Sequence, residues 1–230
     1  MNLDKLDPKQ RKAVETTEGY VVDIAGAGSG KTTALTYRYA YLVNEMGIPP
    51  SSILCVTFTN KAAREMRDRI SKLIEKEFDT SFICTLHSFC RRVLIKEIEC
   101  LPFSGKFSIM DTSDQKTVLK EVYEKLDIST SDIPYNESMN YIEKCKTSAM
   151  WTEAVKILIA QSDPALPDAT KYINEIDFLK RRIYIMYLTF QRKSMVLDFT
   201  DLITFTVYLF NHHPQRLAYW SNKFVYRQAV

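Results

Sequence analysis

A glycine-rich segment that ends in a basic and a hydroxyl residue is the part of this sequence best suited to chemistry. Residues 25–32 read AGAGSGKT, which fits the phosphate-loop pattern [AG]-x-x-x-x-G-K-[ST] with alanine in first place. Small residues are needed because a side chain would hold a triphosphate away from the backbone N–H groups that bind it. Lys31 would reach the β- and γ-phosphates, and the Thr32 hydroxyl would complete the coordination of Mg²⁺. The predicted nucleotide-binding residues of the loop are Ala25, Gly26, Ala27, Gly28, Ser29, Gly30, Lys31 and Thr32. The alternative is a flexible glycine linker.

The segments around this loop alternate between short apolar runs and amphipathic helical patterns. Residues 20–24 form a strand candidate that runs directly into the loop, and apolar residues at helical spacing follow it up to residue 46. Residues 53–58 and 82–84 are the next two strand candidates, and each precedes another helical pattern. Strands that alternate with helices predict an α/β fold with a parallel sheet flanked by helices, as a phosphate loop requires.

The sequence changes character near residues 102–111, and from there to residue 193 it contains helical patterns and few strand signals. Thr112 and Gln115 have the spacing of a capping box, and residues 171–193 predict one long helix. This middle block predicts an all-helical inserted subdomain. The tail from residue 197 predicts one or two helices and a final strand at residues 223–226, which Arg227 and Gln228 would interrupt.

Composition excludes several broad classes of protein. Hydrophobic residues make up 46% and charged residues 26% of the 230 residues, which is typical of a globular chain. The first fifteen residues are polar, and no apolar run approaches the ~18 residues of a membrane span, so secreted and membrane-spanning proteins are excluded. The five cysteines show no C-x-x-C pair, which indicates reduced thiols in the cytoplasm rather than a zinc ribbon. A net charge of +3 does not by itself indicate a nucleic-acid partner.

Four further motifs stand in order around the loop. They are LDPKQRKAV at residues 6–14, VTFTNKAAREM at 56–66, TLHSFC at 85–90 and LDFTDLI at 197–203. Together they resemble the N-terminal half of the UvrD/PcrA/Rep family of superfamily 1 DNA helicases. The resemblance covers the first ~100 residues well and the last ~30 moderately, while the helical middle matches only in position and size.

This resemblance implies a domain plan and an activity. Residues 1–105 would form the first RecA-like domain, residues 106–195 the helical insertion, and residues 196–230 the return to the RecA-like domain. The implied parent activity is hydrolysis of ATP with Mg²⁺, coupled to translocation along single-stranded DNA and to unwinding at single/double-strand junctions. The resemblance implies no membrane partner.

The resemblance also implies roles for individual residues. Gln10 matches a glutamine that reads adenine, since an amide can pair with both N6 and N7; the alternative is an exposed polar residue. Phe58 matches an aromatic residue that stacks on a base of single-stranded DNA; the alternative is a core residue at the end of a strand. The implied DNA-binding residues are Thr57, Phe58, Thr59, Asn60, Thr85 and His87, and the implied catalytic residues are Lys31 and Thr32.

Two departures from the family pattern bear on these expectations. Thr33, which is counted with the nucleotide-binding residues, stands where the closest helicases often have arginine. Related helicase-nuclease subunits also have threonine at this position. The sequence stops at Val230, before the acidic pair that would hold Mg²⁺ and orient water, so the 230 residues alone are expected to bind nucleotide without turnover. Two alternatives remain: the helicase subunit of a recombinational helicase-nuclease, and a nucleotide- or DNA-binding module without turnover.

Overall fold

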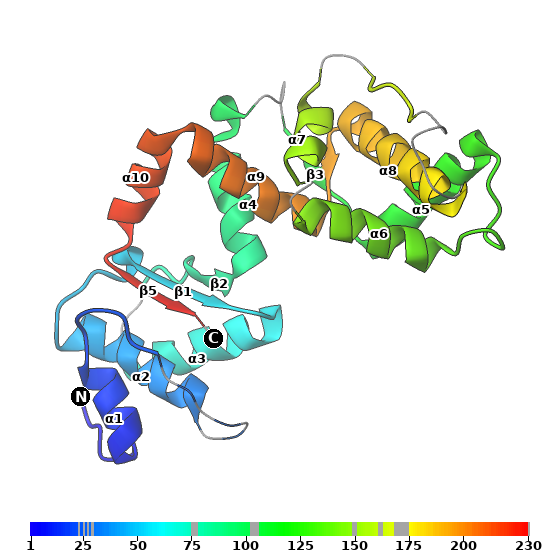
Figure 1. The fold of residues 1–230 in the computed structure, drawn as a ribbon. Coiled ribbons are helices and arrows are strands. Elements are labelled where there is room, and N and C mark those ends of the chain that lie inside the picture. Colours follow the sequence, from blue (N-terminus) through cyan, green and yellow to red (C-terminus); the bar gives the residue numbers. More distant parts are fainter. Residues whose placement is uncertain are drawn as a thin grey trace. The chain divides into compact units, whose positions relative to one another are not determined.

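The fold was obtained as a computed structural model of residues 1–230, shown as a ribbon in Figure 1. The structure describes residues 1–22, 24, 26, 28, 30–74, 78–101, 106–148, 151–160, 163–167 and 175–229. The chain divides into two compact units. Met1–Phe89 and Gln215–Val230 form the first unit, and Cys90–Pro214 forms the second. The domain limits expected at residues 105 and 195 stay a prediction.

The first unit contains a three-stranded parallel sheet in the order β2–β1–β5. Its strands are β1 (Ile53–Thr57), β2 (Ile83–Thr85) and β5 (Tyr226–Ala229). Ile53 pairs with Tyr226 and Thr57 with Thr85, so the carboxyl ends of all three strands meet at one edge of the sheet. The expected parallel α/β fold is confirmed.

Helices cover both faces of this sheet. The first unit holds α1 (Pro8–Glu15), α2 (Lys31–Asn44), the 3₁₀ turn Pro50–Ser52, α3 (Asn60–Ile74) and nearly all of α10 (Pro214–Lys223). In Figure 1, α2 and α3 lie on one side of the sheet and α10 on the other. One core cluster of the first unit joins Tyr39 and Leu42 of α2 to Ile53, Met66 and Ile83, all of which are buried. Apolar residues at helical spacing therefore produce the two helices that close over β1.

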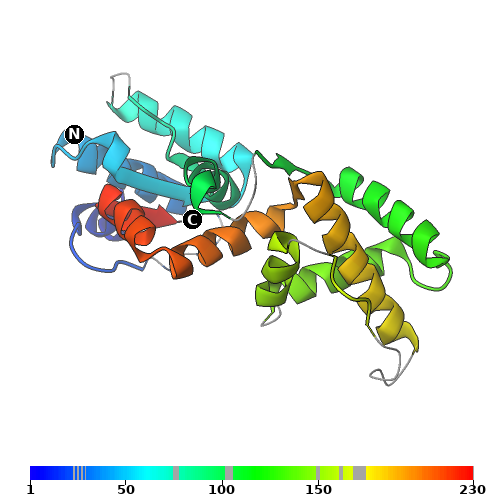
Figure 2. The ribbon, with the colours of Figure 1, turned by 90° about the horizontal axis from the view of Figure 1, so that it is seen from above.

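The second unit is almost entirely helical (Figure 2). It holds most of α4 (Leu86–Lys96), the 3₁₀ turn Ile98–Cys100, α5 (Thr112–Leu126), α6 (Tyr135–Thr147), α7 (Trp151–Ile159), α8 (Glu175–Ser194) and α9 (Phe199–His212). α8 packs against α5, α6 and α7. A two-residue parallel pair joins β3 (Ser108–Ile109) to β4 (Val196–Leu197). The helical block is confirmed; residues 171–174 of the predicted long helix lie outside the described residues.

The strand predicted at residues 20–24 is wrong for the part of it that the structure describes, residues 20–22 and 24, which have no regular secondary structure. The side chains of Tyr20, Val22 and Ile24 are almost completely exposed. Apolar and β-branched residues favour a strand only where a neighbouring strand pairs with them. The described residues of this segment form no ladder with β5, the edge strand of the sheet.

The final strand differs from the prediction at both of its ends. It begins at Tyr226 rather than at Lys223, which is the last residue of α10. Arg227 and Gln228 belong to β5 and do not interrupt it. Pairing with β1 uses backbone groups, so an exposed arginine does not prevent it.

The capping box of α5 lies one residue earlier than predicted. Asp111 is the N-cap, its Oδ1 accepts a hydrogen bond from the Asp114 N–H (3.0 Å), and Asp114 Oδ2 accepts one from the Asp111 N–H (3.0 Å). An aspartate at the cap position satisfies the same orphan N–H groups as the predicted threonine.

None of the helices within the described ranges is long and apolar enough to span a membrane.

Candidate nucleotide and nucleic-acid site

The glycine-rich loop ends at the N-terminus of α2. Gly30 is the residue before the helix, and its φ of +86° lies in the left-handed region that glycine adopts most easily. No side chain among the described residues caps α2. Helix N-termini of this kind bind anions through their first N–H groups and the helix dipole. Gly26 and Gly28 are exposed, whereas Ala25, Ala27 and Ser29 lie outside the described residues.

The Lys31 side chain folds back over the loop. Its Nζ donates a hydrogen bond to the Gly26 carbonyl oxygen at 2.7 Å, although Gly26 stands five residues earlier. Lys31, Thr32 and Thr33 form the half-buried first turn of α2. The ammonium group is therefore held at the loop, and an uncapped helix N-terminus with this lysine and a hydroxyl fits a magnesium-bound triphosphate.

Helix α1 brings Gln10 to the same loop. The side chain of Gln10 completes the capping box of α1, where its Oε1 accepts a hydrogen bond from the Asp7 N–H at 3.2 Å. A Cβ atom placed on Gly30 would lie only 2.5 Å from Gln10 Nε2. Gln10 and the loop, which are twenty residues apart in the sequence, are thus in direct contact; its role toward adenine stays a prediction.

A cavity of about 850 Å³ lies beside Lys31, between α2, residues 17–22 and β5. Its lining includes two residues that the sequence analysis did not assign to the site, Arg38 and Gln228. Arg38 donates to the carbonyl oxygens of Ala13 (2.5 Å) and Thr16, and burial lowers the pKa of its guanidinium. Gln228 is only 6% exposed, and its amide has no hydrogen-bond partner within the described part of the chain. Neither residue belongs to a motif, so only their place in the wall of this cavity identifies them.

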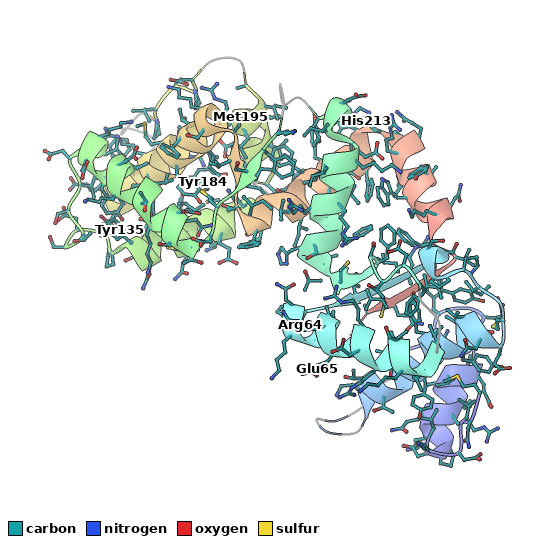
Figure 3. The ribbon with its side chains drawn as sticks, turned by 180° about the vertical axis from the view of Figure 1, so that it is seen from behind. Arg64, Glu65, Tyr135, Tyr184, Met195 and His213 are labelled. Atoms are coloured by element: carbon teal, nitrogen blue, oxygen red, sulfur yellow. The ribbon has the colours of Figure 1, made fainter. Side chains whose placement is uncertain are left out.

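The second group of candidate residues lies where β1 meets α3. Phe58 follows the buried strand β1, yet its side chain is 91% exposed. The alternative of a core residue at the end of a strand is therefore wrong. Asn60 is exposed in the first turn of α3, and Arg64 and Glu65 point outward from the next turn (Figure 3). An exposed aromatic ring beside a helix N-terminus is suited to stacking on a base whose phosphate lies at the helix.

The threonines of this group serve local structure. The Thr59 hydroxyl accepts a hydrogen bond from the Ala62 N–H (3.1 Å), so Thr59 rather than Asn60 caps α3. Thr57 and Thr85 are buried neighbours in the sheet. The Thr85 hydroxyl donates to Ser88 Oγ (2.9 Å) and accepts from the Ser88 N–H (3.2 Å), which caps α4.

His87 is half-buried in the first turn of α4. The structure thus presents Phe58, Thr59 and Asn60 together at the surface of the first unit and keeps Thr57 and Thr85 inside it.

A parallel sheet flanked by helices, with a glycine-rich loop leading into one of them, defines the class of phosphate-loop α/β proteins. Within that class, the chain belongs to the UvrD/REP helicase N-terminal domain family, whose sequence profile matches residues 6–226. It is similar to the ATP-dependent DNA helicase PcrA of Staphylococcus aureus (strain Mu50), with 36% identity over 227 residues. PcrA of Staphylococcus epidermidis (strain ATCC 35984) is also 36% identical over 227 residues. Each match covers 97% of this chain and 29% of the relative, so the chain spans less than a third of their length.

Proposed function

We propose that this chain is the ATP- and single-stranded-DNA-binding N-terminal part of an ATP-dependent DNA helicase. Membership of the UvrD/REP helicase N-terminal domain family supports the proposal. The observation that carries it is Phe58, a large aromatic side chain left 91% exposed in the same unit that holds the Lys31 loop. Leaving such a ring in water forgoes about 1.5–3 kcal/mol of burial, which favours a binding role.

The nucleotide half of the site would use the loop and α1. The loop glycines and the first N–H groups of α2 would bind the phosphates, Lys31 would neutralise their charge, and Thr32 would contribute its hydroxyl to Mg²⁺. Gln10 would contact the base. ATP supplies the phosphoryl group whose transfer to water releases free energy, and residues 25–33 bind and orient it.

The DNA half would use the β1–α3 junction. Phe58 would stack on a base, while Asn60 and the first N–H groups of α3 would contact a phosphate. The proposed partners are single-stranded DNA and single/double-strand junctions, because stacking on an exposed ring requires an unpaired base. We place this activity in the cytoplasm, in keeping with five free cysteines.

Replacing the ring tests the proposal. Phe58→Ala should weaken the binding of a fluorescent oligo-dT by about 1–3 kcal/mol, because one stacked base is lost. Phe58→Trp should retain the affinity, since indole also offers a flat apolar face. Tyr219→Ala, which removes another exposed aromatic residue of the first unit, is the matched control and should leave binding unchanged.

Fluorescence anisotropy measures the affinities, and circular dichroism checks the fold. Equal affinities for Phe58→Ala and the parent, with the fold intact, would contradict the proposed DNA site. The same holds if Phe58→Ala and Tyr219→Ala weaken binding equally.

A further inference from the structure

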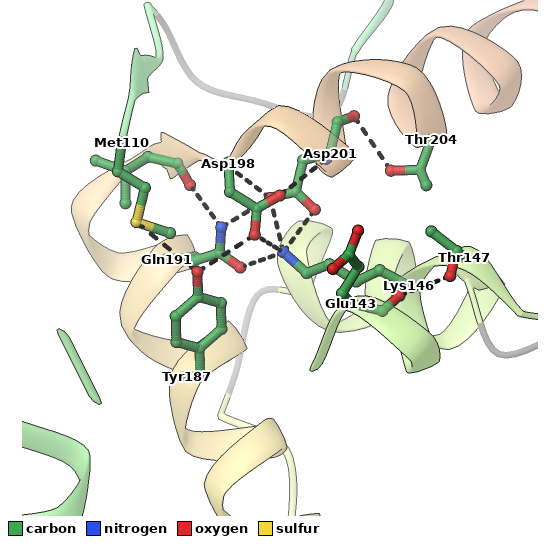
Figure 4. A network of polar contacts seen from close by, with 10 residues as sticks. Met110, Glu143, Lys146, Thr147, Tyr187, Gln191, Asp198, Asp201 and Thr204 are labelled. Atoms are coloured by element: carbon green, nitrogen blue, oxygen red, sulfur yellow. Dashed lines mark hydrogen bonds and ion pairs between the residues drawn. The ribbon is translucent and has the colours of Figure 1, made fainter. Parts of the chain in front are cut away.

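Lys146 of α6 is completely buried in the second unit, and its ammonium group is surrounded by oxygen atoms (Figure 4). Its Nζ lies 2.6 Å from Asp198 Oδ2 and 2.8 Å from Gln191 Oε1. Both carboxylate oxygens of Asp201 are also close, Oδ1 at 2.8 Å and Oδ2 at 2.9 Å. The contacts with Gln191 Oε1, Asp198 Oδ2 and Asp201 Oδ2 are hydrogen bonds, two of them between opposite charges, and the contact with Asp201 Oδ1 is an ion pair. Four oxygens, from α8 and from the N-cap and first turn of α9, thus surround a cation that α6 provides.

Other hydrogen bonds hold these oxygens in place without Lys146. Asp198 and Asp201 form the capping box of α9, in which each carboxylate accepts a hydrogen bond from the other residue's N–H at 3.0 Å. Gln191 Nε2 donates to Asp201 Oδ2 at 2.7 Å, and the Tyr187 hydroxyl donates to Asp198 Oδ2 at 3.2 Å. The oxygen cage, which we define as the side-chain oxygens of Gln191, Asp198 and Asp201, is therefore built by α8 and α9 alone.

The cage carries more negative charge than its cation neutralises. Two carboxylates face one ammonium, and Asp201 Oδ1 accepts no well-oriented hydrogen bond within the described residues. Burial and the neighbouring Asp198 raise the pKa of Asp201 to about 6. Burial acts to lower the pKa of Lys146, but the two carboxylates raise it overall, so the lysine is charged. A cage of this kind requires a cation, since an unpaired carboxylate is costly in the interior.

We infer that this oxygen cage is a binding site for a small monovalent cation, permanently occupied by the chain's own Lys146. The side chain of Lys146 ties α6 to the LDFTDLI motif of residues 197–203, which runs from β4 through the N-cap of α9 into its first turns. The two aspartates of that motif serve this site in the second unit, and neither DNA nor Mg²⁺ is needed to explain them. The class of ligand that fits the site is an ammonium or primary alkylammonium ion.

Shortening the lysine and supplying the missing fragment tests this inference. Lys146→Ala removes three methylenes and the ammonium group, which together correspond to propylammonium. We expect Lys146→Ala to lower the Tm of the chain and to increase hydrogen exchange in α6 and α9. Propylammonium chloride should restore part of both losses, while tetramethylammonium chloride at the same concentration should not, because it has no N–H donor.

Two further variants keep the test decisive. Lys146→Met fills the same space without charge and should not respond to propylammonium. Lys144→Ala removes an exposed lysine of the same helix and should neither lose stability nor respond. If Lys146→Ala does not fold alone, refolding yield with each salt becomes the readout. The inference is overturned if the two salts act equally on Lys146→Ala, or if Lys146→Met responds as strongly.

Discussion

At the scale of single residues, Phe58 and Lys146 reverse the positions that their types usually take. Phe58 is an aromatic residue that is 91% exposed, and Lys146 is a charged residue that is 0% exposed. The first forgoes the free energy of burying a ring, and the second loses the hydration of an ammonium group. Each residue therefore needs a partner: the structure provides one for Lys146, and we propose a DNA base for Phe58.

The prediction at the scale of single residues concerns Lys31 and the binding of ATP. Lys31→Ala should weaken the binding of ATP with Mg²⁺ by about 1.5–3 kcal/mol, because a charge-assisted contact to the phosphates is lost. Lys12→Ala, which removes an exposed lysine of α1, should leave the affinity unchanged. Titration with a fluorescent ATP analogue measures both variants. Equal affinity in Lys31→Ala and the parent would mean that the loop is not the nucleotide site.

At the scale of elements, β5 is an edge strand of the sheet in the first unit. One side of β5 pairs with β1, while residues of the strand line the 850 Å³ cavity. Gln228 lies on the buried face of this strand without a hydrogen-bond partner within the described residues. A buried amide that is left unpaired costs about 1–3 kcal/mol, so this position destabilises the first unit as it stands.

Gln228→Met should therefore raise the free energy of unfolding by about 1 kcal/mol, since a thioether of similar length has no amide to desolvate. Gln191→Met is the matched control. The Gln191 amide is also buried but donates to Asp201 and accepts from Lys146, so its replacement should destabilise the chain. Urea unfolding measures both variants. If Gln228→Met destabilises as much as Gln191→Met, a partner such as water satisfies the Gln228 amide.

At the scale of the whole molecule, charge is nearly balanced. The chain has 31 lysines and arginines against 28 aspartates and glutamates, a net charge of +3. On α3, the exposed Arg64 is followed by the exposed Glu65, so basic residues near Phe58 are partly offset. Affinity for single-stranded DNA would then rest more on stacking than on phosphate contacts.

The salt dependence of DNA binding tests this balance. With about three phosphate contacts, at a slope near −0.7 each, log K against log salt should have a slope of about −2. Phe58→Ala should lower the affinity at every salt concentration without changing the slope, because stacking releases no counterions. Anisotropy titrations with oligo-dT between about 50 and 200 mM salt measure this slope for the parent and for Phe58→Ala. A slope steeper than about −5 would indicate a concentrated basic surface that the net charge conceals.

Several features of the site follow from the sequence because short-range patterns fix them. Apolar residues at helical spacing predicted the helices after β1 and β2, since a helix is built from contacts three and four residues apart. The position of the phosphate loop before α2 follows from its glycines and from Lys31. The exposure of Phe58 did not follow, because an aromatic residue at the end of a strand is equally compatible with the core. Only the packing around β1 decides it.

The sequence by itself determined the family motifs, the α/β pattern and the helical block, because each depends on residues that are close together along the chain. The tertiary structure alone decided the irregular conformation of residues 20–22 and 24, the register of β5 and the oxygen cage. Lys146 lies 52 residues from Asp198 and 55 from Asp201, yet their charged atoms are within 3 Å of each other. One sequence signal does precede it: Lys146 falls on the same helical face as Ser138, Ile142 and Cys145, which are all buried. Which groups neutralise a charge on that face depends on which helices pack against it. The spacing of residues along the chain does not determine that packing.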